Sequence, residues 1–309
     1  MKKRIYLLGL ISLLVSCNST SASNSSGVQQ NLSPKIIVPN GTPTLGIANY
    51  AVNHMDNVEV VAGPKLLSAA FASKDKDIII APINLGVTRY NTDTSYSLYR
   101  TLVWDNIYLV SRSEITTLND LANQKITSFG KSSTPEIILN TILSTSNLTD
   151  SVEVEYLDNV TMANSMFVDG SRDIIITAQP NLSLIDTSNS YVTPLNKFWK
   201  EATNLDSYPQ SGIFVKTSEY DELKTALSEI DQAIAEISQD VAKSAKNGEI
   251  VTNNAFKEDV LLNAIPLCGY KTFDNEKSLL EGYFRIMIDK GMGSSIGGKL
   301  PDEAFYLKK

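Results

Sequence analysis

The sequence contains few of the residues from which catalytic and metal-binding sites are most often built. It has one histidine, His54, and two cysteines, Cys17 and Cys268, in 309 residues. The motifs G-x-S-x-G, H-E-x-x-H and C-x-x-C are absent, and a lone histidine lacks the partners that a general base or a zinc site requires. We therefore expect no catalytic residue, no metal and no cofactor, with His54 at the surface or in packing.

Basic segments are missing as well. After the first four residues no run of lysine and arginine occurs, and the formal net charge is -7, which argues against nucleic acid as the main partner. The hydrophobic content of 42% is enough for one large domain or for two lobes of about 100 to 150 residues.

Residues 1–17 are predicted to be a lipoprotein signal peptide. Three basic residues precede an apolar run over residues 5–15, which is too short to span a bilayer and fits the apolar part of a secretory signal. The tetrapeptide Leu-Val-Ser-Cys that ends at Cys17 resembles the bacterial lipobox, in which the cysteine is lipidated and begins the mature protein. The alternatives are an uncleaved anchor and ordinary secretion, and the protein is exported in each case.

Residues 18–33 are polar and of low complexity, so we expect a flexible tether between the lipid and the folded body. Cys268 is then the only cysteine besides the lipidated one, and no disulfide framework is expected. A lone cysteine in an apolar context is predicted to be a small buried residue.

The folded body contains an internal repeat. Strand-like runs at residues 35–39, 58–61 and 78–80 alternate with helical segments, and the same order recurs from Lys125 to residue 176 at offsets of about 90 to 96 residues. Continuous apolar strands that alternate with helices predict a parallel sheet covered on both faces. The chain is therefore predicted to be an α/β protein with two similar βαβαβ units.

Two such units predict two lobes whose strand ends face a shared cleft, because open α/β sheets bind ligands at the carboxyl ends of their strands. The β-prone segments Tyr99 to Ser111 and Tyr208 to Val215 are predicted to be strands that cross between the lobes and act as hinges. The expected organisation is a first part of lobe one (34–110), lobe two (111–207), and a return crossing with the remainder of lobe one (208–309).

The last third of the chain is predicted to be mainly helical. Apolar residues at alternating spacings of four and three predict one long helix with a core-facing stripe, formed by Leu223, Leu227, Ile230, Ile234, Ile237 and Val241. Residues 260–265 and 277–290 are expected to form further helices. The glycine-rich segment 291–306 is expected to be irregular.

The stretch from Lys125 to Leu143 is a strand, a turn and a helix start. Gly130 ends the strand, hydroxyl residues fill the turn, Thr134 is the predicted N-cap and Pro135 the first helical residue. The stretch is not a phosphate-binding P-loop, because Lys125 stands where that motif requires glycine. Such a helix start directs backbone N–H groups outward and is a potential seat for a polar or anionic group, although a plain helix cap has the same pattern.

These features together resemble the solute-binding lipoproteins of bacterial ABC importers, of the periplasmic-binding-protein type II-like class. The resemblance extends over the whole chain and includes the crossing segment Trp104-Asp105-Asn106 and the ending at residues 296–306. It is closest to the superfamily of thiamine-precursor, nitrate and alkanesulfonate binding proteins. What it implies is a monomer, anchored on the outer face of the cell membrane, that closes on a small solute and delivers it to permease and ATPase subunits.

Candidate ligand-binding side chains follow from this layout. They lie in the turns after the predicted strands and on the crossing strand, and they are Thr42, Thr44, Asn84, Trp104, Asn106, Ser132, Ser133, Thr134 and Gln179. Trp104 and Asn106 are expected to share one face of the crossing strand, with Trp104 either stacking on a heterocycle or forming part of the core. The hydroxyl residues are either ligands or exposed turn residues.

The sequence narrows the chemical class of the solute but does not identify it. Lys131 is the one cation at the predicted turns, and Glu136 offsets it, which favours a neutral or weakly anionic solute such as an aromatic heterocycle. A sulfonate or carboxylate at Thr134 stays open. Two other functions also stay open, namely an enzyme of the thiamine-precursor synthase type, in which His54 and Cys268 would have to meet, and a surface adhesin or receptor partner.

Overall fold

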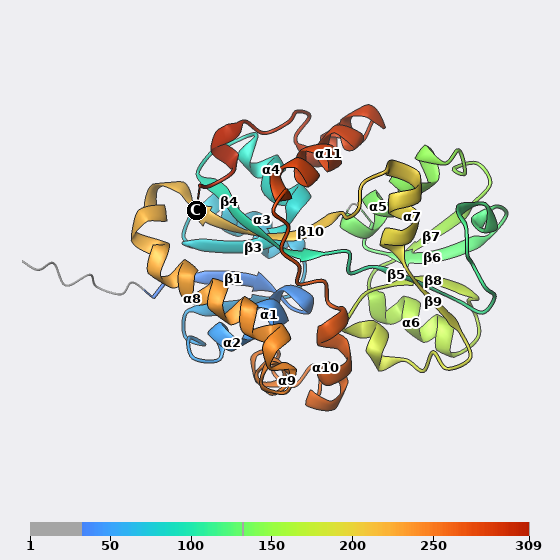
Figure 1. The fold of residues 1–309 in the computed structure, drawn as a ribbon, viewed down its shortest axis with the longest axis horizontal. Coiled ribbons are helices and arrows are strands. Elements are labelled where there is room, and N and C mark those ends of the chain that lie inside the picture. Colours follow the sequence, from blue (N-terminus) through green and yellow to red (C-terminus); the bar gives the residue numbers. More distant parts are fainter. Residues whose placement is uncertain (1–32, 132, 309) are drawn as a thin grey trace, which may run out of the picture. The chain divides into compact units, whose positions relative to one another are not determined.

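The computed structural model describes residues 33–131 and 133–308, and these form two five-stranded sheets flanked by helices (Figure 1). The strand orders are β2-β1-β3-β10-β4 and β7-β6-β8-β5-β9. We call the first sheet with its helices lobe one and the second sheet with its helices lobe two. The predicted signal segment with Cys17, the tether up to residue 32, and Ser132 lie outside the described residues.

The sheet of lobe one is parallel over three strands and antiparallel at its other end. Its strands are β1 (Ile36–Pro39), β2 (Val58–Val61), β3 (Ile78–Pro82), β4 (Tyr96–Trp104) and β10 (Pro209–Lys216). β1 pairs in parallel with β2 and β3, whereas β10 runs antiparallel between β3 and β4. The central strands are almost wholly buried, as expected for runs of β-branched residues covered on both faces. Four helices follow the first three strands, namely α1 (Thr42–Gly46), α2 (Ala48–Ala51), α3 (Pro64–Ser73) and α4 (Ile83–Tyr90).

The sheet of lobe two repeats this arrangement. β6 (Lys125–Phe129) pairs in parallel with β7 (Glu153–Leu157) and β8 (Ile174–Thr177), and β5 (Tyr108–Ser111) runs antiparallel between β8 and β9 (Tyr191–Pro194). Its helices are α5 (Thr134–Thr145), α6 (Val160–Val168) and α7 (Leu195–Thr203). Since both sheets share the order second, first, third strand, the predicted two-lobed α/β fold with repeated βαβ units is confirmed.

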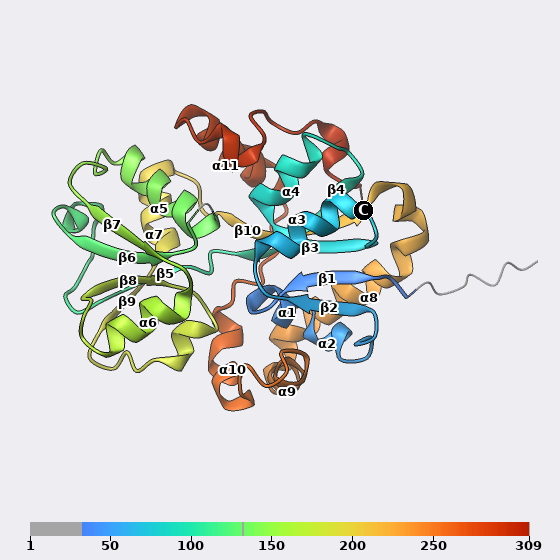
Figure 2. The ribbon, with the colours of Figure 1, turned by 180° about the vertical axis from the view of Figure 1, so that it is seen from behind.

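The crossing segments differ from the two continuous strands that the sequence predicts. The segment from Tyr99 to Ser111 is divided into β4 and β5, which belong to different sheets, because Asp105 adopts φ 52° and interrupts the extended backbone. The return strand β10 lies within lobe one, and the chain crosses just before it. Figure 2 shows both crossings between the sheets, and the Asp105 N–H donates to the Tyr208 carbonyl across them at 3.2 Å.

Asp105 also fastens the two crossings with its side chain. One carboxylate oxygen accepts from the Tyr208 N–H at 2.9 Å, and the other accepts from the Ser207 hydroxyl and from Lys271 Nζ, the latter at 2.9 Å. The carboxylate side chain is only 3% exposed, while that of Lys271 is 44% exposed. Asp105 therefore joins the hinge region to the C-terminal part of the chain.

The C-terminal helices are α8 (Tyr220–Gln239), α9 (Val241–Val251), α10 (Glu258–Ala264) and α11 (Glu276–Asp289). The predicted apolar stripe is buried along α8, but it does not continue as one helix to Val241. Asp240 leaves the helical conformation at ψ 81°, and its side chain accepts from the Lys243 N–H to begin α9. The tail is largely irregular as predicted, with two single turns, η5 (Gly293–Ile296) and η6 (Glu303–Phe305).

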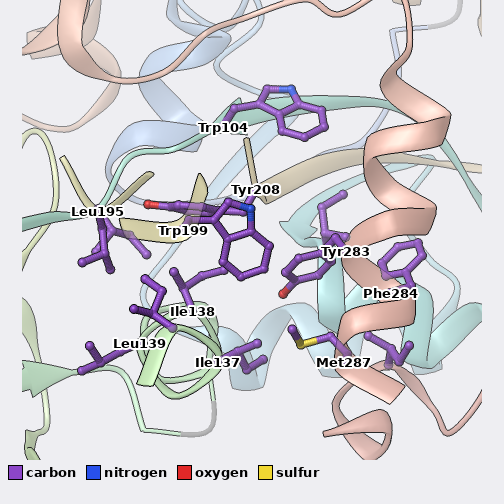
Figure 3. Close-up of a cluster of buried hydrophobic side chains, with 14 of the residues drawn as sticks. Trp104, Ile137, Ile138, Leu139, Leu195, Trp199, Tyr208, Tyr283, Phe284 and Met287 are labelled. Atoms are coloured by element: carbon purple, nitrogen blue, oxygen red, sulfur yellow. The ribbon is translucent and has the colours of Figure 1, made fainter. Parts of the chain in front are cut away.

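An apolar cluster connects the lobes beside the crossings. Figure 3 shows Tyr283 and Met287 of α11 directed toward Trp199 of α7 and Ile137 of α5. The rings of Trp199 and Tyr283 have centroids 5.8 Å apart. Helix α11 thus packs on lobe two as well as on lobe one. No helix among residues 33–131 and 133–308 has the length and apolar character needed to cross a bilayer.

Candidate ligand-binding site

A cavity of about 270 Å³ lies between the two lobes. The last residues of parallel strands from both sheets reach it, since Pro39, Pro82 and Phe129 end β1, β3 and β6, and Ala178 follows β8. The carboxyl ends of parallel strands are where open α/β sheets form ligand sites. The cavity therefore occupies the position at which the repeat predicts a shared cleft.

Three of the predicted side-chain positions join the lobes at the edge of this cavity. The Thr42 hydroxyl of lobe one donates to the Gln179 carbonyl of lobe two at 2.5 Å. Asn106, on the crossing segment, donates from Nδ2 to Thr42 Oγ1 at 2.6 Å and to the same carbonyl at 3.0 Å, and its Oδ1 accepts from the Gln179 N–H at 3.0 Å. All three residues are at least 95% buried. We call this group of contacts the interlobe clasp.

The start of α5 also lines the cavity. Ser133 and Thr134 line the cavity, whereas Ser132 is outside the described residues. The N-cap is Ser133 and not Thr134, because Ser133 is extended at φ -135° and Thr134 is already helical. The Ser133 hydroxyl donates to the Gly130 carbonyl at 2.6 Å and does not cap the helix. Thr134 Oγ1 faces Asn84 Oδ1 of lobe one at 3.5 Å, a long and weak contact.

Thr44, Asn84 and Trp104 do not line the cavity. The Thr44 hydroxyl is fully buried and donates to the Pro39 carbonyl at 2.8 Å, so it holds the turn after β1 together. Trp104 is 1% exposed and packs edge-on against Phe273 with a centroid distance of 4.9 Å. The expectation that Trp104 and Asn106 share a face is wrong, because the positive φ of Asp105 between them breaks the strand alternation.

The structure adds polar side chains that the sequence does not single out, notably Asn40, Asn181, Gln210 and Ser211. Gln210 Oε1 accepts from the Asn106 N–H at 3.0 Å. Ser211 is 4% exposed, and its hydroxyl has no hydrogen-bond partner among the described residues. The signal that could have found this pair is its position at the start of β10, directly after the return crossing.

The described residues that line the cavity include no Asp, Glu, Lys, Arg or His. Lys131 is exposed and is not one of them. A doubly charged anion would lose its hydration without gaining a fixed counter-charge. The lining instead consists of proline and other apolar groups interspersed with hydroxyls and primary amides, which suits a solute of low charge.

The two side chains on which the sequence-based enzyme alternative depends lie in different surroundings. His54 stacks on Tyr50 at 4.1 Å, and its Nδ1 lies 2.9 Å from the Tyr50 carbonyl. Cys268 is fully buried in an apolar cluster, and burial raises the pKa of its thiol to about 12. Neither residue lines the cavity. Among residues 33–131 and 133–308, no group of His, Cys, Asp and Glu side chains is arranged to hold a metal ion.

Comparison with solved structures shows the same fold. An ABC transporter protein from Parabacteroides distasonis superposes with a TM-score of 0.73 at 20% identity, over 89% of this chain and 98% of the other. The periplasmic aliphatic sulphonate binding protein SsuA from Escherichia coli has a TM-score of 0.65 at 13% identity, over 89% and 93% of the two chains. No family model matches the sequence, and no curated protein matches it.

A further structure with this fold is a mutant of DszB in complex with biphenyl-2-sulfinic acid, which superposes with a TM-score of 0.51 at 11% identity, over 83% of this chain and 92% of the other. At these identities the likeness establishes the two-lobed fold of periplasmic binding proteins. The chemistry must be inferred from the cavity itself.

Proposed function

We propose that this chain is the solute-binding component of an ABC importer, which captures a small neutral or weakly anionic solute between its lobes. The observation that carries the proposal is the cavity of about 270 Å³ at the strand ends of both sheets, lined by neutral polar groups and bordered by the interlobe clasp. A site made by two lobes is released when they separate, which suits capture and delivery. The sulphonate binding protein and the ABC transporter protein with the same fold support this assignment.

The partners in this proposal are the small solute, the permease and the ATPase, with no role for nucleic acid. The chain is a monomer that Cys17 anchors through lipid to the outer face of the cell membrane, or to the periplasmic side where a second membrane exists. The segment with the lipobox-like tetrapeptide and the extracytoplasmic location of the sulphonate binding protein support this placement.

A thermal-shift screen of heterocycles, sulfonates, nitrate and amino acids tests the proposal. A ligand present at about a thousand times its dissociation constant stabilises the folded state by about 4 kcal/mol. Ala178→Leu places a larger side chain in the cavity wall and should abolish the shift, while Ala255→Leu makes the same change at an exposed position and should not. Stabilisation that survives Ala178→Leu would place binding elsewhere and contradict the proposal.

Catalysis is the main competing function that the sequence leaves open. A reaction in this cavity would need a nucleophile or a proton-transfer group at the substrate. The described lining offers hydroxyls and amides but no His, Cys, Lys or carboxylate side chain. No specific contact favours catalysis over binding, and none favours the adhesin alternative.

A further inference from the structure

Two primary amides at the cavity, those of Asn40 and Gln210, are fixed in orientation by backbone N–H groups. A backbone N–H can only donate, so the amide atom that it meets must be the oxygen. Asn40 Oδ1 accepts from the Gly41 N–H at 2.9 Å, and Gln210 Oε1 accepts from the Asn106 N–H at 3.0 Å. The Gln179 amide meets the Ser183 hydroxyl at 2.8 Å, and because a hydroxyl can donate or accept, this contact does not fix its orientation. In Asn40 and Gln210 the carbonyl end is therefore occupied by the protein.

The NH₂ ends of the same amides are left for a ligand. Asn40 Nδ2 and Gln210 Nε2 have no hydrogen-bond partner among the described residues, and both residues line the cavity. The buried and unpartnered Ser211 hydroxyl adds a further group that can donate. An unpaired buried donor costs free energy unless a bound molecule accepts its hydrogen bond.

The backbone supplies fewer donors here than a helix start usually does. Pro43 and Pro135 occupy the first turns of α1 and α5 beside the cavity, and proline has no N–H. The Ser133 N–H is used by the Gly130 carbonyl at 3.0 Å. Recognition at this site thus depends mainly on the side-chain amides and not on the helix start.

From this arrangement we infer that the solute binds through hydrogen-bond acceptors, such as carbonyl, sulfonyl, nitro or ring-nitrogen groups, and carries no ammonium group. The inference rests on the proposed function and narrows its substrate class. An ammonium group would face NH₂ donors, and no carboxylate among the described lining residues could pair with it. We therefore expect uncharged acceptors and simple monoanions to bind in preference to amines, amino acids and aminosulfonates.

Two matched series of probes test this class. The aromatic series is methyl phenyl sulfone, benzenesulfonate and benzylamine, and the aliphatic series is ethyl methyl sulfone, propanesulfonate, propylamine and 2-aminoethanesulfonate. Within each series the hydrocarbon part is similar while charge and donor character change, and 2-aminoethanesulfonate matches propanesulfonate in size. We expect the sulfones or sulfonates to raise the Tm and the amine-containing members to have no effect.

Variants then test the donors themselves. Gln210→Glu keeps the oxygen that accepts from the Asn106 N–H and replaces the NH₂ group by a second oxygen, so acceptor probes should bind at least about tenfold more weakly. Asn140→Asp is the matched control, because it adds the same charge on α5, keeps the oxygen that accepts from Tyr156, and lies outside the lining. Circular dichroism checks that each variant is folded.

The possible failures are distinguishable. Binding of benzylamine, propylamine or the aminosulfonate would overturn the acceptor inference and leave the proposed function intact, as would unchanged affinity of acceptor probes in Gln210→Glu. If no member of either series raises the Tm of the unmodified chain at millimolar concentration, and the broader screen also finds no ligand, the proposed function fails and the inference fails with it.

Discussion

Thr42 offers the most direct test of the contact between the lobes. Thr42→Val keeps the shape of the side chain and removes the hydroxyl that donates to the Gln179 carbonyl and accepts from Asn106. The Gln179 carbonyl keeps its bond from Asn106 Nδ2 at 3.0 Å, while the Nδ2 hydrogen that Thr42 accepted loses its partner. The loss is therefore two net hydrogen bonds, or about 1–3 kcal/mol.

This free energy acts on the equilibrium between joined and separated lobes. A change of about 1–3 kcal/mol reduces the ratio of joined to separated molecules by about 5- to 150-fold. Solute affinity falls in proportion once the joined form is no longer the major one. Thr44→Val is the matched control, because it removes a hydroxyl from the same turn whose bond to Pro39 lies within lobe one. It should lower the free energy of unfolding without separating the lobes.

Pulsed electron–electron double resonance between two spin labels measures the distance between the lobes directly. Spin labels can be placed at Leu66→Cys on α3 and Val168→Cys on α6, which are 50% and 59% exposed in lobes one and two. Cys17 is replaced in this background, and the buried Cys268 should not react with the label. Thr42→Val should show an added population at longer distance in the absence of solute. A distance distribution identical to that of the Thr44→Val control would refute the role of Thr42 in holding the lobes together.

Three further predictions concern the hinge and the core. Asp105→Ala removes a buried carboxylate with three partners and should lower the free energy of unfolding by about 2–4 kcal/mol. Lys271→Ala changes a side chain that is 44% exposed and should lower it by less than about 1 kcal/mol. Chemical denaturation measures both values, and equal losses would contradict the larger contribution of Asp105. Gly269→Ala should prevent stable folding, because φ is +77° and the new Cβ would lie 1.7 Å from a carbonyl oxygen of β4, while Gly63→Ala, at φ +80° with open space, should cost about 1 kcal/mol. Burial raises the pKa of Cys268 to about 12 from 9.0, so the thiol ionises at lower pH in the unfolded chain, and the free energy of unfolding should fall as the pH rises above about 9. Alkylation at pH 8 followed by mass spectrometry should modify Cys268 only in denaturant. Rapid modification of the native chain would count against the burial of Cys268.

The strands and their order could be predicted from the sequence because short-range signals determine them. Runs such as Ile78 to Ile80 are apolar at every position, and this pattern marks strands buried on both faces. The same order of elements at two places in the chain then predicts two similar sheets. The positions at which regular secondary structure ends were harder to predict. Asp105 and Asp240 end regular structure through backbone angles and side-chain bonds that apolar periodicity does not record.

The misplacement of Trp104 follows from one such break. Period-two alternation predicts that Trp104 and Asn106 share a face, and a continuous strand would place both at the cleft. With Asp105 at φ 52° the alternation is lost, so Asn106 reaches the cavity while Trp104 stays in the core. An aromatic platform for a heterocycle is therefore not provided by Trp104. Of the described aromatic residues, Phe129 is the one that lines the cavity.

The donor character of the cavity could not be predicted from the sequence for a different physical reason. A glutamine or asparagine side chain has a donor end and an acceptor end, and the end that faces a ligand depends on which end the protein uses. Asn106 bonds to groups 64, 73 and 104 positions away in the chain, at Thr42, Gln179 and Gln210. Only the folded chain brings these residues together, and by accepting the Asn106 N–H, Gln210 is left with its NH₂ free for the solute. The stretch from Lys125 to Leu143 suggests an anion seat by local pattern, but the long-range amides determine what the cavity can bind.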